Sequence, residues 1–582
     1  MANYIKARTL CLYQPTIPHD DAMKIVLAQQ NYHIGNFEKN IEKIVSAIKV
    51  AKDMGGDLVV FSELCVCGYP PRDFLEFNDF IDKCYQALDV IKAHADTIGV
   101  LVGCPARNPV VEGKDLFNAA FLLYEKEIKG EVHKTLLPNY DVFDEYRYFE
   151  PAFNWNVLEF KGKKLAVTIC EDIWNLHDNP LYRICPMDIL IDQQPDMMIN
   201  LSASPFDYIH DEERKSVIKS NVLHYKLPMF YCNAVGSQTE IVFDGASLVF
   251  DANGVLCKCL PSFEEAIVAV TLNDDGSIEE SAVDTIKPIS HIMPNPVKYD
   301  AARNIKSIHQ ALVAGIKDYF LKMGFTKAII GSSGGIDSAV TLALACEALG
   351  KENVRAILMP SPYSSAHSVD DAVQLSINLG NPYDIIKIAD VYESFLATLK
   401  PIFNDSPFGI AEENIQSRSR GNLLMGIANK FGYILLNTSN KSELATGYGT
   451  LYGDMAGGLS VLGDCYKMQV YVLAEFINKS AELIPLNIIH KAPSAELRPD
   501  QKDADSLPPY DLLDQVLYQY IERRKGPQEI KAQGFDPSMV DRILKLVNSN
   551  EYKRNQFCPI IRISPKAFGV GRRVPIVAKY LS

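Results

Sequence analysis

Short apolar runs rich in β-branched residues alternate with helical patterns along the first half of the chain, which predicts an α/β fold. The helical patterns cover 37–52 and 80–98, and Asp251-Ala252-Asn253-Gly254 predicts a hairpin turn in a later, antiparallel part. The apolar runs predict strands at Lys24–Gln30, Asp57–Ser62, Val100–Cys104, Leu165–Cys170, Met197–Ala203 and Met229–Asn233. This mixture favours an α/β sandwich over a purely parallel sheet.

The second half alternates strand and helix again, which predicts a doubly wound parallel sheet with ligands at the carboxyl ends of its strands. Strands are predicted at Lys327–Gly331, Arg355–Met359, Ile385–Ile388 and Tyr433–Asn437. Between the halves, Asp284–Tyr299 is rich in proline and predicts a linker. We therefore expect one domain at 1–283, a linker at 284–299 and a second domain at 300–582, with Met1–Asp21 as an extension that packs on something else.

The composition agrees with two globular domains and indicates the cellular compartment of the protein. The chain has 582 residues, 47% of them hydrophobic, and a net charge of -14, which argues against a nucleic-acid binder. No apolar run is long enough to span a membrane, and Met1–Pro15 lacks the layout of a signal peptide. The thirteen cysteines include no CxxC pair, which disfavours zinc sites and disulfides. These features predict a cytoplasmic protein.

A loop of glycine and serine is the strongest chemical signal in the second half. Ser333-Gly334-Gly335-Ile336-Asp337-Ser338 follows an apolar run and precedes a helical stretch, Ala339–Leu349. Glycines let the backbone approach an anion, and the helix N-terminus adds N–H groups and positive potential. The arrangement predicts a phosphate cradle, but not a Walker A loop, because no lysine follows the second glycine. The alternative is an ordinary tight turn capped by a serine.

Further polar residues gather near the ends of predicted strands in this half. Asp337, Glu443 and Asp454 offer carboxylates for Mg²⁺, and Lys467 offers a cation for departing pyrophosphate. Taken singly, each has an ordinary alternative as a surface carboxylate, a helix cap or a solvated lysine. Together with the loop, they predict adenylation of a carboxylate.

Three separated residues in the first half each end an apolar run: Glu63, Lys134 and Cys170. A cysteine nucleophile needs a base and a cation that stabilises the tetrahedral oxyanion. A nearby lysine also favours the thiolate, and a glutamate can carry the proton to departing ammonia. Cys170 alone would more simply be interpreted as a buried core thiol, but the order of a glutamate, a lysine and this cysteine favours catalysis.

The second half resembles the ATP pyrophosphatase (PP-loop) superfamily and, within it, the NAD synthetases. The resemblance covers nearly all of Tyr299–Ser582 and includes the spacing of Thr438, Glu443 and Lys467, as well as the motifs Glu413–Arg418, Pro493–Gln501 and Glu551–Arg554. It implies a Rossmann-like, doubly wound sheet. It also implies an ATP site at Ser333, Gly334, Gly335, Ile336, Asp337, Ser338, Thr438 and Lys467, a deamido-NAD site at Asn414, Arg418, Glu443 and Lys553, and Mg²⁺ at Asp337 and Glu443.

The first half resembles the nitrilase superfamily and, more closely, the glutaminase domain of the glutamine-dependent NAD synthetases. The matching motifs include Gly68–Asp73, Lys134–Tyr140, Phe143–Glu145 and Cys170–Asp172. The resemblance implies a four-layer αββα sandwich. It also implies Glu63 as general base, Lys134 as oxyanion stabiliser, Cys170 as nucleophile, Glu145 as the carboxylate that orients Lys134, the N–H of Glu171 in the oxyanion hole, and Tyr140 and Ser204 as glutamine ligands.

One position departs from this pattern. Six residues after Ser204, where relatives often carry arginine or lysine, this chain has His210. A neutral imidazole would hold the glutamine carboxylate less well than a guanidinium, so His210 is left out of the predicted site.

Together the resemblances imply that glutamine, ATP and deamido-NAD are the substrates, that ammonia passes between two sites inside the protein, and that the chain forms a homo-oligomer. The alternatives are another PP-loop ATP-dependent amidotransferase with a nitrilase-type ammonia source, and a non-catalytic scaffold that keeps the fold.

Overall fold

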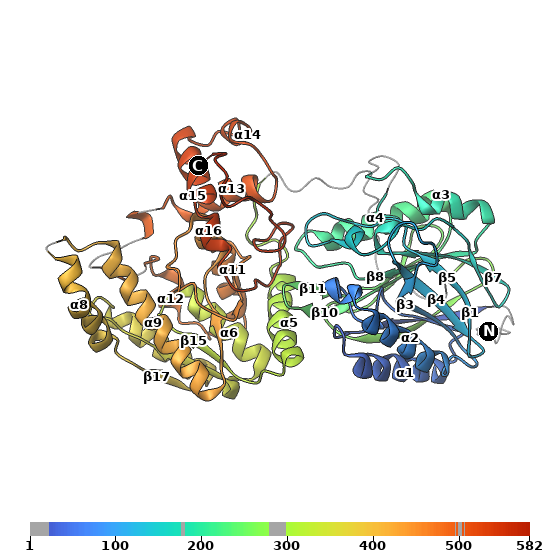
Figure 1. Ribbon diagram of the computed structural model, residues 1–582, viewed down its shortest axis with the longest axis horizontal. Helices are drawn as coiled ribbons and strands as arrows, with labels where there is room; N and C mark the ends of the chain where they lie inside the picture. The colour runs from blue at the N-terminus through green and yellow to red at the C-terminus, as the bar shows by residue number, and fades with distance from the viewer. Residues whose placement is uncertain are drawn as a thin grey trace, which may run out of the picture.

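Two α/β halves lie side by side in the computed structural model (Figure 1). The structure describes residues 22–175, 181–278, 298–404, 406–494, 496–498, 503–505 and 507–581. The predicted extension, Met1–Asp21, and the predicted linker, apart from Lys298 and Tyr299, lie outside the described residues.

Two six-stranded sheets form the centre of the first half. In both, the strands at the middle are buried on two faces, which explains their nearly continuous apolar sequences. The first sheet has the order β14 (Ala266–Leu272), β1 (Met23–Gln29), β2 (Leu58–Val60), β3 (Gly99–Arg107), β4 (Leu116–Tyr124), β5 (Glu127–His133). The second has the order β13 (Leu256–Cys259), β12 (Leu248–Phe250), β9 (Met229–Asn233), β8 (Met197–Ser202), β7 (Lys163–Ile169), β6 (Leu158–Phe160).

These sheets face each other, and helices cover both outer faces (Figure 1). One apolar cluster joins side chains of both sheets. A second packs α1 (Phe37–Asp53) and α2 (Asn78–Lys92) on the first sheet, and a third packs α3 (Pro186–Leu190) and α4 (His210–Tyr225) on the second. The predicted four-layer sandwich is therefore confirmed, and so is the turn at 251–254, which joins β12 to β13.

The second half contains a five-stranded parallel sheet, as predicted. Its order is β17 (Tyr383–Ile385), β16 (Val354–Leu358), β15 (Ala328–Gly331), β18 (Ile434–Asn437), β19 (Leu459–Ser460). Apolar residues of α5 (Ile305–Met323), α6 (Ile336–Leu349) and α11 (Lys467–Ile477) cover one face, and α9 (Ile410–Phe431) covers the other. The chain order reverses between β15 and β18, so their carboxyl ends open the crevice where ligands bind in such sheets.

The remaining helices of this half surround the sheet and its carboxyl edge. They are α7 (Ala366–Leu379), α8 (Ala389–Phe403), α10 (Lys441–Thr446), α12 (Leu486–His490), α13 (Tyr510–Ile521), α14 (Pro527–Lys531), α15 (Pro537–Ser549) and α16 (Glu551–Arg554). In the described residues, no helix has both the length and the apolar character that crossing a membrane requires.

Three predicted boundaries were wrong for local reasons. The helix predicted at 80–98 stops at Lys92, and the side chain of Asp96 forms a turn by accepting from the N–H of Thr97 at 2.8 Å. The strand predicted at 385–388 lies two residues earlier, where Asp384 pairs with Arg355 of the neighbouring strand. The helix expected from Ala339 begins at Ile336, so the end of the glycine-serine loop is already its first turn.

The two halves meet through α5, which faces the hairpin of β10 (Val235–Gln238) and β11 (Ile241–Asp244) (Figure 1). Apolar residues of both halves share one cluster there. Lys322 of α5 donates to the side-chain oxygen of Asn31 at 2.7 Å and to the carbonyls of Tyr32 and Ser237 at 2.9 and 2.7 Å. Three acceptors from the first half thus hold one ammonium from the second.

Candidate active sites

The three chemical residues predicted in the first half each follow a strand, and the fold brings them together. Glu63 follows β2, Lys134 comes directly after β5, and Cys170 comes directly after β7. The ammonium of Lys134 lies 2.7 Å from the Glu63 carboxylate and 2.8 Å from that of Glu145. All four side chains are buried, so these charges interact with little screening by water.

Burial decides the ionisation of this cluster. Burial and the Glu63 charge raise the pKa of the Cys170 thiol well above its usual value, although Lys134 opposes the rise. Burial also raises the pKa of Glu145 to about 7, against the pull of Lys134. For Lys134, burial alone would lower the pKa, but Glu145 and Glu63 outweigh it and raise the pKa. The thiol is therefore protonated at rest and needs a base to become a nucleophile.

The backbone at Cys170 is strained. Its φ of 44° lies in the left-handed region, which costs a residue other than glycine free energy. The strand ends at Ile169, and Cys170 begins a short 3₁₀ turn, Cys170–Ile173. Asp172 in this turn accepts N–H groups from Ile169, Thr135 and Leu136 at 3.0, 3.0 and 2.8 Å, which ties the turn to the segment after Lys134.

Sequence reasoning missed two residues that hold the glutamates in place. Asn118 donates to Glu63 at 2.7 Å, and Tyr69 donates to Glu145 at 2.7 Å. Asn118 had a detectable signal, because it is a polar residue inside the otherwise apolar strand β4. Tyr69 had none beyond its place in a matching motif.

The two predicted glutamine ligands have different partners: Tyr140 contacts the carboxylate of Glu171, the residue after Cys170, and Ser204 contacts His210. The hydroxyl of Tyr140 donates to Glu171 at 2.9 Å, and Tyr182 donates to the same carboxylate at 3.1 Å. The hydroxyl of Ser204 lies 2.8 Å from Nε2 of His210, the residue left out of the predicted site. A wall of hydroxyls, one carboxylate and one imidazole therefore stands beside the thiol.

In the second half, the glycine-serine loop has the geometry that an anion cradle requires. Gly334 has a φ of 79°, and a Cβ there would lie 2.2 Å from the carbonyl oxygen of Ser368, so no other residue fits. The Ser338 hydroxyl donates to the carbonyl of Gly335 at 2.9 Å, and the Ser333 hydroxyl accepts from the N–H of Gly335 at 3.2 Å. These contacts fix the loop before any ligand arrives.

Two carboxylates and one lysine lie next to this loop. Lys467 forms an ion pair with Asp337 and lies 3.9 Å from Glu443. Asn440 donates to Asp337 at 2.9 Å, and Glu443 completes the N-terminal cap of α10. Burial and the neighbouring Asp337 raise the pKa of Glu443 well above its usual value. The pair of carboxylates therefore has an unfavourable interaction that a bound cation would relieve.

A cavity of about 300 Å³ opens at the carboxyl ends of β15 and β18. Every residue predicted to bind ATP lines it: Ser333, Gly334, Gly335, Ile336, Asp337, Ser338, Thr438 and Lys467. Glu443 and Asp454 line it as well.

The other residues predicted for deamido-NAD lie together, but beside the cavity. Asn414 accepts from Thr450 at 2.8 Å, and Arg418 donates to the carbonyl of Leu451 at 3.2 Å. Lys553 donates to the carbonyls of Gly447 and Gly449, both at 2.8 Å. All three therefore support the loop 447–454, of which Tyr448, Gly453 and Asp454 line the cavity.

These two sites define a protein that joins a carbon–nitrogen hydrolase to an NAD synthase. The carbon–nitrogen hydrolase family model matches residues 24–278, and the NAD synthase model matches residues 308–557. Glutamine-dependent NAD(+) synthetases from Synechocystis sp. and Thermotoga maritima are 43% and 42% identical, each over 96% of this chain and 99% of the relative. The chain belongs to the glutamine-dependent NAD(+) synthetase family.

Solved structures agree with this assignment. The glutamine-dependent NAD+ synthetase from Acinetobacter baumannii, solved in complex with ADP, is 37% identical with a TM-score of 0.74, over 96% of this chain and 98% of that one. A glutamine-dependent NAD(+) synthetase from Cytophaga hutchinsonii has a TM-score of 0.78 over the same shares at 19% identity, and therefore supports the fold alone.

Proposed function

We propose that this chain makes NAD from deamido-NAD, with glutamine as the nitrogen donor and ATP as the activating substrate. The observation that carries the proposal is the presence of both polar sites in one chain of this family: Lys134 held between Glu63 and Glu145 beside Cys170, and Lys467 paired with Asp337 at the glycine-serine loop. The first site suits amide hydrolysis, and the second suits transfer of AMP to a carboxylate.

In the first half, Cys170 attacks the side-chain amide of glutamine while Glu63 takes the thiol proton. Lys134 stabilises the oxyanion together with the N–H of Glu171, and Glu145 orients Lys134. Glu63 then gives its proton to the departing ammonia, which leaves a glutamyl thioester on Cys170. Water hydrolyses the thioester to glutamate and restores the thiol.

Glutamine is held by the wall beside the thiol. Tyr140 and Ser204 supply hydroxyls, and the carboxylate of Glu171 offers a partner for the α-ammonium group. Ser204 donates to the α-carboxylate. These contacts bind the α-ammonium and α-carboxylate groups of glutamine and leave its side-chain amide directed at the sulfur.

In the second half, the nicotinate carboxylate of deamido-NAD attacks the α-phosphorus of ATP and displaces pyrophosphate. Ser333–Ser338 and Thr438 hold ATP, while Lys467 offsets the charge that develops on the leaving pyrophosphate. Deamido-NAD is held by Glu443 and, across the loop 447–454, by Asn414, Arg418 and Lys553. Ammonia then attacks the adenylate and releases AMP and NAD.

Magnesium fits the same place. Among the described residues, no cluster of three or more His, Cys, Asp or Glu side chains could hold a metal alone. Mg²⁺ is commonly held by one or two carboxylates together with substrate phosphates, and Asp337 and Glu443 provide such a pair. When bound there, Mg²⁺ would neutralise phosphate charge.

The test separates the two halves. Cys170→Ala should lose glutamine-driven NAD formation by about 10³-fold or more and retain ammonia-driven formation. Asp337→Asn should lose both by about 10²-fold while pyrophosphate release falls in parallel. Cys232→Ala, a buried thiol on β9, and Glu347→Gln on α6 are the matched controls. Pyrophosphate release that does not depend on deamido-NAD would favour another amidotransferase.

We infer that ammonia passes between the sites within the protein, because free ammonia is mostly protonated at neutral pH and is then not a nucleophile. Glutamine labelled with ¹⁵N at its amide should give labelled NAD even in excess unlabelled ammonium. Complete dilution of the label would contradict internal transfer.

We also propose that the chain works as a homo-oligomer in the cytoplasm. Apolar side chains are exposed on α8, on α9 and in the connection between them, among them Ile402, Phe408 and Ile410, which suits a contact with a second copy. The cysteines that the structure describes are free thiols, and a reducing compartment would keep them so. Light scattering of the wild type and of Ile402→Lys should show an oligomer that the substitution weakens.

A further inference from the structure

Asp514 on α13 holds the starts of two helices that carry residues of the second site. Its carboxylate accepts from the hydroxyl of Ser442 at 2.5 Å and from the N–H of Met468 at 2.9 Å. Ser442 precedes Glu443 in the first turn of α10, and Met468 follows Lys467 in the first turn of α11. One carboxylate therefore contacts the neighbour of each of these two predicted site residues.

The hydroxyl of Ser442 joins the two helices directly. Its oxygen accepts from the backbone N–H of Lys467 at 2.9 Å, while its hydrogen goes to Asp514. Since a hydroxyl has one hydrogen, Asp514 fixes the direction of that hydrogen and leaves a lone pair of the oxygen for Lys467. Beside this link, the N–H of Lys441 donates to the carbonyl of Cys465 at 2.8 Å. The first turn of α10 is therefore bound both to the first turn of α11 and to the segment before it.

These groups are closed off from water. Asp514 and Ser442 are fully buried, and Lys467 is nearly so, so water does not replace a bond that is lost there. Burial raises the pKa of Asp514 to about 7, against its hydrogen bonds and the charge of Lys467. Tyr510, one turn earlier on α13, has its ring centre 5.4 Å from the Lys467 ammonium. One face of α13 thus supports both the backbone and the side chain of this lysine.

The position of Lys467 matters for rate more than for binding. Its ammonium forms an ion pair with Asp337 and lies 3.9 Å from Glu443. A charge that stabilises a transition state acts because it is already in place, and a small displacement is enough to slow the reaction. The glycine-serine loop that holds ATP precedes α6 and belongs to neither α10 nor α11. A shift between those two helices should therefore affect catalysis while ATP still binds.

We propose that Asp514 is a positioning residue for adenylation: through the Ser442 hydroxyl, it holds Lys467 at the place relative to Glu443 where the lysine meets the departing pyrophosphate. The inference rests on the proposed function, because it assumes that Lys467 offsets charge on pyrophosphate. It predicts that loss of either Asp514 or Ser442 slows pyrophosphate formation and leaves the affinity for ATP largely unchanged.

The experiment measures pyrophosphate formation from ATP and deamido-NAD, with ammonium as the nitrogen donor so that the first half is not required. Asp514→Asn keeps the size of the side chain but replaces one acceptor oxygen by a donor, and Ser442→Ala removes the hydroxyl. Each should lower kcat by roughly tenfold and change KM for ATP by less than about twofold. Assays well above pH 7 keep the Asp514 carboxylate ionised.

Two further measurements separate positioning from stability. If Asp514 and Ser442 act through one bond, the variant with both substitutions should lose about as much rate as either single variant, and not the roughly hundredfold product. Calorimetric titration with α,β-methylene ATP and magnesium counts the competent sites and gives their affinity. A merely structural role would lower the number of competent sites and leave kcat per competent site unchanged.

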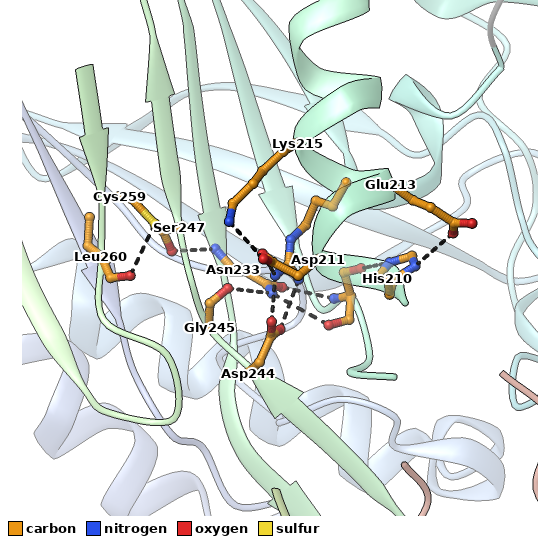
Figure 2. A network of polar contacts seen from close by, with 12 residues as sticks. His210, Asp211, Glu213, Lys215, Asn233, Asp244, Gly245, Ser247, Cys259 and Leu260 are labelled. Atoms are coloured by element: carbon orange, nitrogen blue, oxygen red, sulfur yellow. Dashed lines mark hydrogen bonds and ion pairs between the residues drawn. The ribbon is translucent and has the colours of Figure 1, made fainter. Parts of the chain in front are cut away.

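Asp244 provides a matched control, because it is a buried carboxylate of the other half. Figure 2 shows Asp244 in a polar network of the first half, and Arg214 binds it at 2.9 and 2.5 Å. Asp244→Asn should lower stability, as Asp514→Asn does, but should keep the wild-type kcat per competent site.

The outcomes separate the two proposals. If wild-type protein forms no pyrophosphate from ATP and deamido-NAD, the proposed function fails. If it does, and both single variants keep the wild-type kcat per competent site, the role of Asp514 is overturned while the proposed function stands. Multiplied losses in the double variant would also overturn it, because each residue would then act on its own. Should Asp514→Asn not fold, kcat per competent site of Ser442→Ala decides alone.

Discussion

Each half of the molecule has a fully buried lysine that forms short ion pairs with two carboxylates, Lys134 in the first half and Lys441 in the second, and of these two clusters only that of Lys134 belongs to a predicted active site. Lys134 lies 2.7 and 2.8 Å from Glu63 and Glu145, and Lys441 lies 2.9 and 2.8 Å from Asp464 and Glu522. Both lysines are fully buried. Each cluster even has a buried thiol within the field of its lysine, Cys170 in one and Cys465 in the other.

The two clusters differ in how many N–H donors of each ammonium remain after its hydrogen bonds to protein acceptors. An ammonium has three donors. Lys441 also donates to Ser564 at 2.7 Å and to the carbonyl of Lys566 at 3.0 Å, so its donors are fully used by the protein. Among the described residues, the hydrogen bonds of Lys134 go to its two glutamates, which leaves one donor for a substrate oxygen. A buried lysine whose three donors all bind protein acceptors supports the structure. A buried lysine that keeps an unused donor can bind a substrate oxygen and take part in catalysis.

The largest effect on activity should come from replacing Lys134, the lysine that keeps one N–H donor for the substrate. Lys134→Met should reduce glutamine-driven NAD formation by about 10³-fold, because the oxyanion loses its cation, while ammonia-driven formation continues. The matched control is Lys129→Met, at the surface of the same strand, which should change neither rate. Equal loss with both nitrogen donors would mean that Lys134, like Lys441, is structural.

Removing the other lysine should affect stability instead. Lys441→Met leaves Asp464 and Glu522 buried without their cation, and should cost about 3–5 kcal/mol of unfolding free energy in urea titration. Adding Glu522→Gln should recover part of that loss. Lys525→Met removes an exposed ion pair with Glu529 and should change the unfolding free energy far less, because water and salt screen such a pair. A Lys441→Met protein as stable as the wild type would contradict the comparison.

The same contrast explains what sequence could predict. Lys134 was found because it belongs to a motif, Lys134–Tyr140, that matches the nitrilase superfamily, although the strand before it, β5, is mostly polar and exposed. Lys441 was not, although it stands next to predicted residues, because three of its partners, Glu522, Ser564 and Lys566, lie 81, 123 and 125 residues away and nothing local marks it as buried. The α/β sandwich, the parallel sheet and the loop followed from apolar periodicity and glycine chemistry, whereas the four layers came from the resemblance to the nitrilase superfamily. The bond of Asn118 to Glu63 and the contact of His210 with Ser204 depend on tertiary packing, so the sequence alone did not predict these partners.

A segment near the C-terminus connects the two regions and offers a smaller test. Arg562 lies 2.7 Å from Asp141, the neighbour of Tyr140, and Ser564 two residues later binds Lys441. Arg562→Met should therefore uncouple the halves, and raise the glutamate formed per NAD by roughly fivefold. Arg573→Met, exposed in the same segment, is the control. An unchanged ratio would show that the segment carries no coupling.

The smallest expected effect concerns the pH dependence of the Lys134 cluster. Burial raises the pKa of Glu145 from its ordinary 4.5 to about 7, with Lys134 opposing and Glu63 adding to the rise. The folded protein therefore binds this proton more tightly than the unfolded chain does. The resulting stability is complete below about pH 4.5 and is lost as pH rises to about 7.

Glu145→Gln cannot ionise, so it isolates that contribution. The unfolding free energy of wild type minus that of Glu145→Gln should fall between about pH 4.5 and about pH 7, by no more than about 1.4 kcal/mol per pH unit, and stay level above it. Urea titrations across this range measure the difference. Glu522→Gln in the Lys441 cluster should show the same sign, because burial raises the pKa of Glu522 too. A difference that rises with pH would mean that Lys134 stabilises the Glu145 carboxylate by more than burial costs, and the two clusters would then differ in electrostatics as well as in donors.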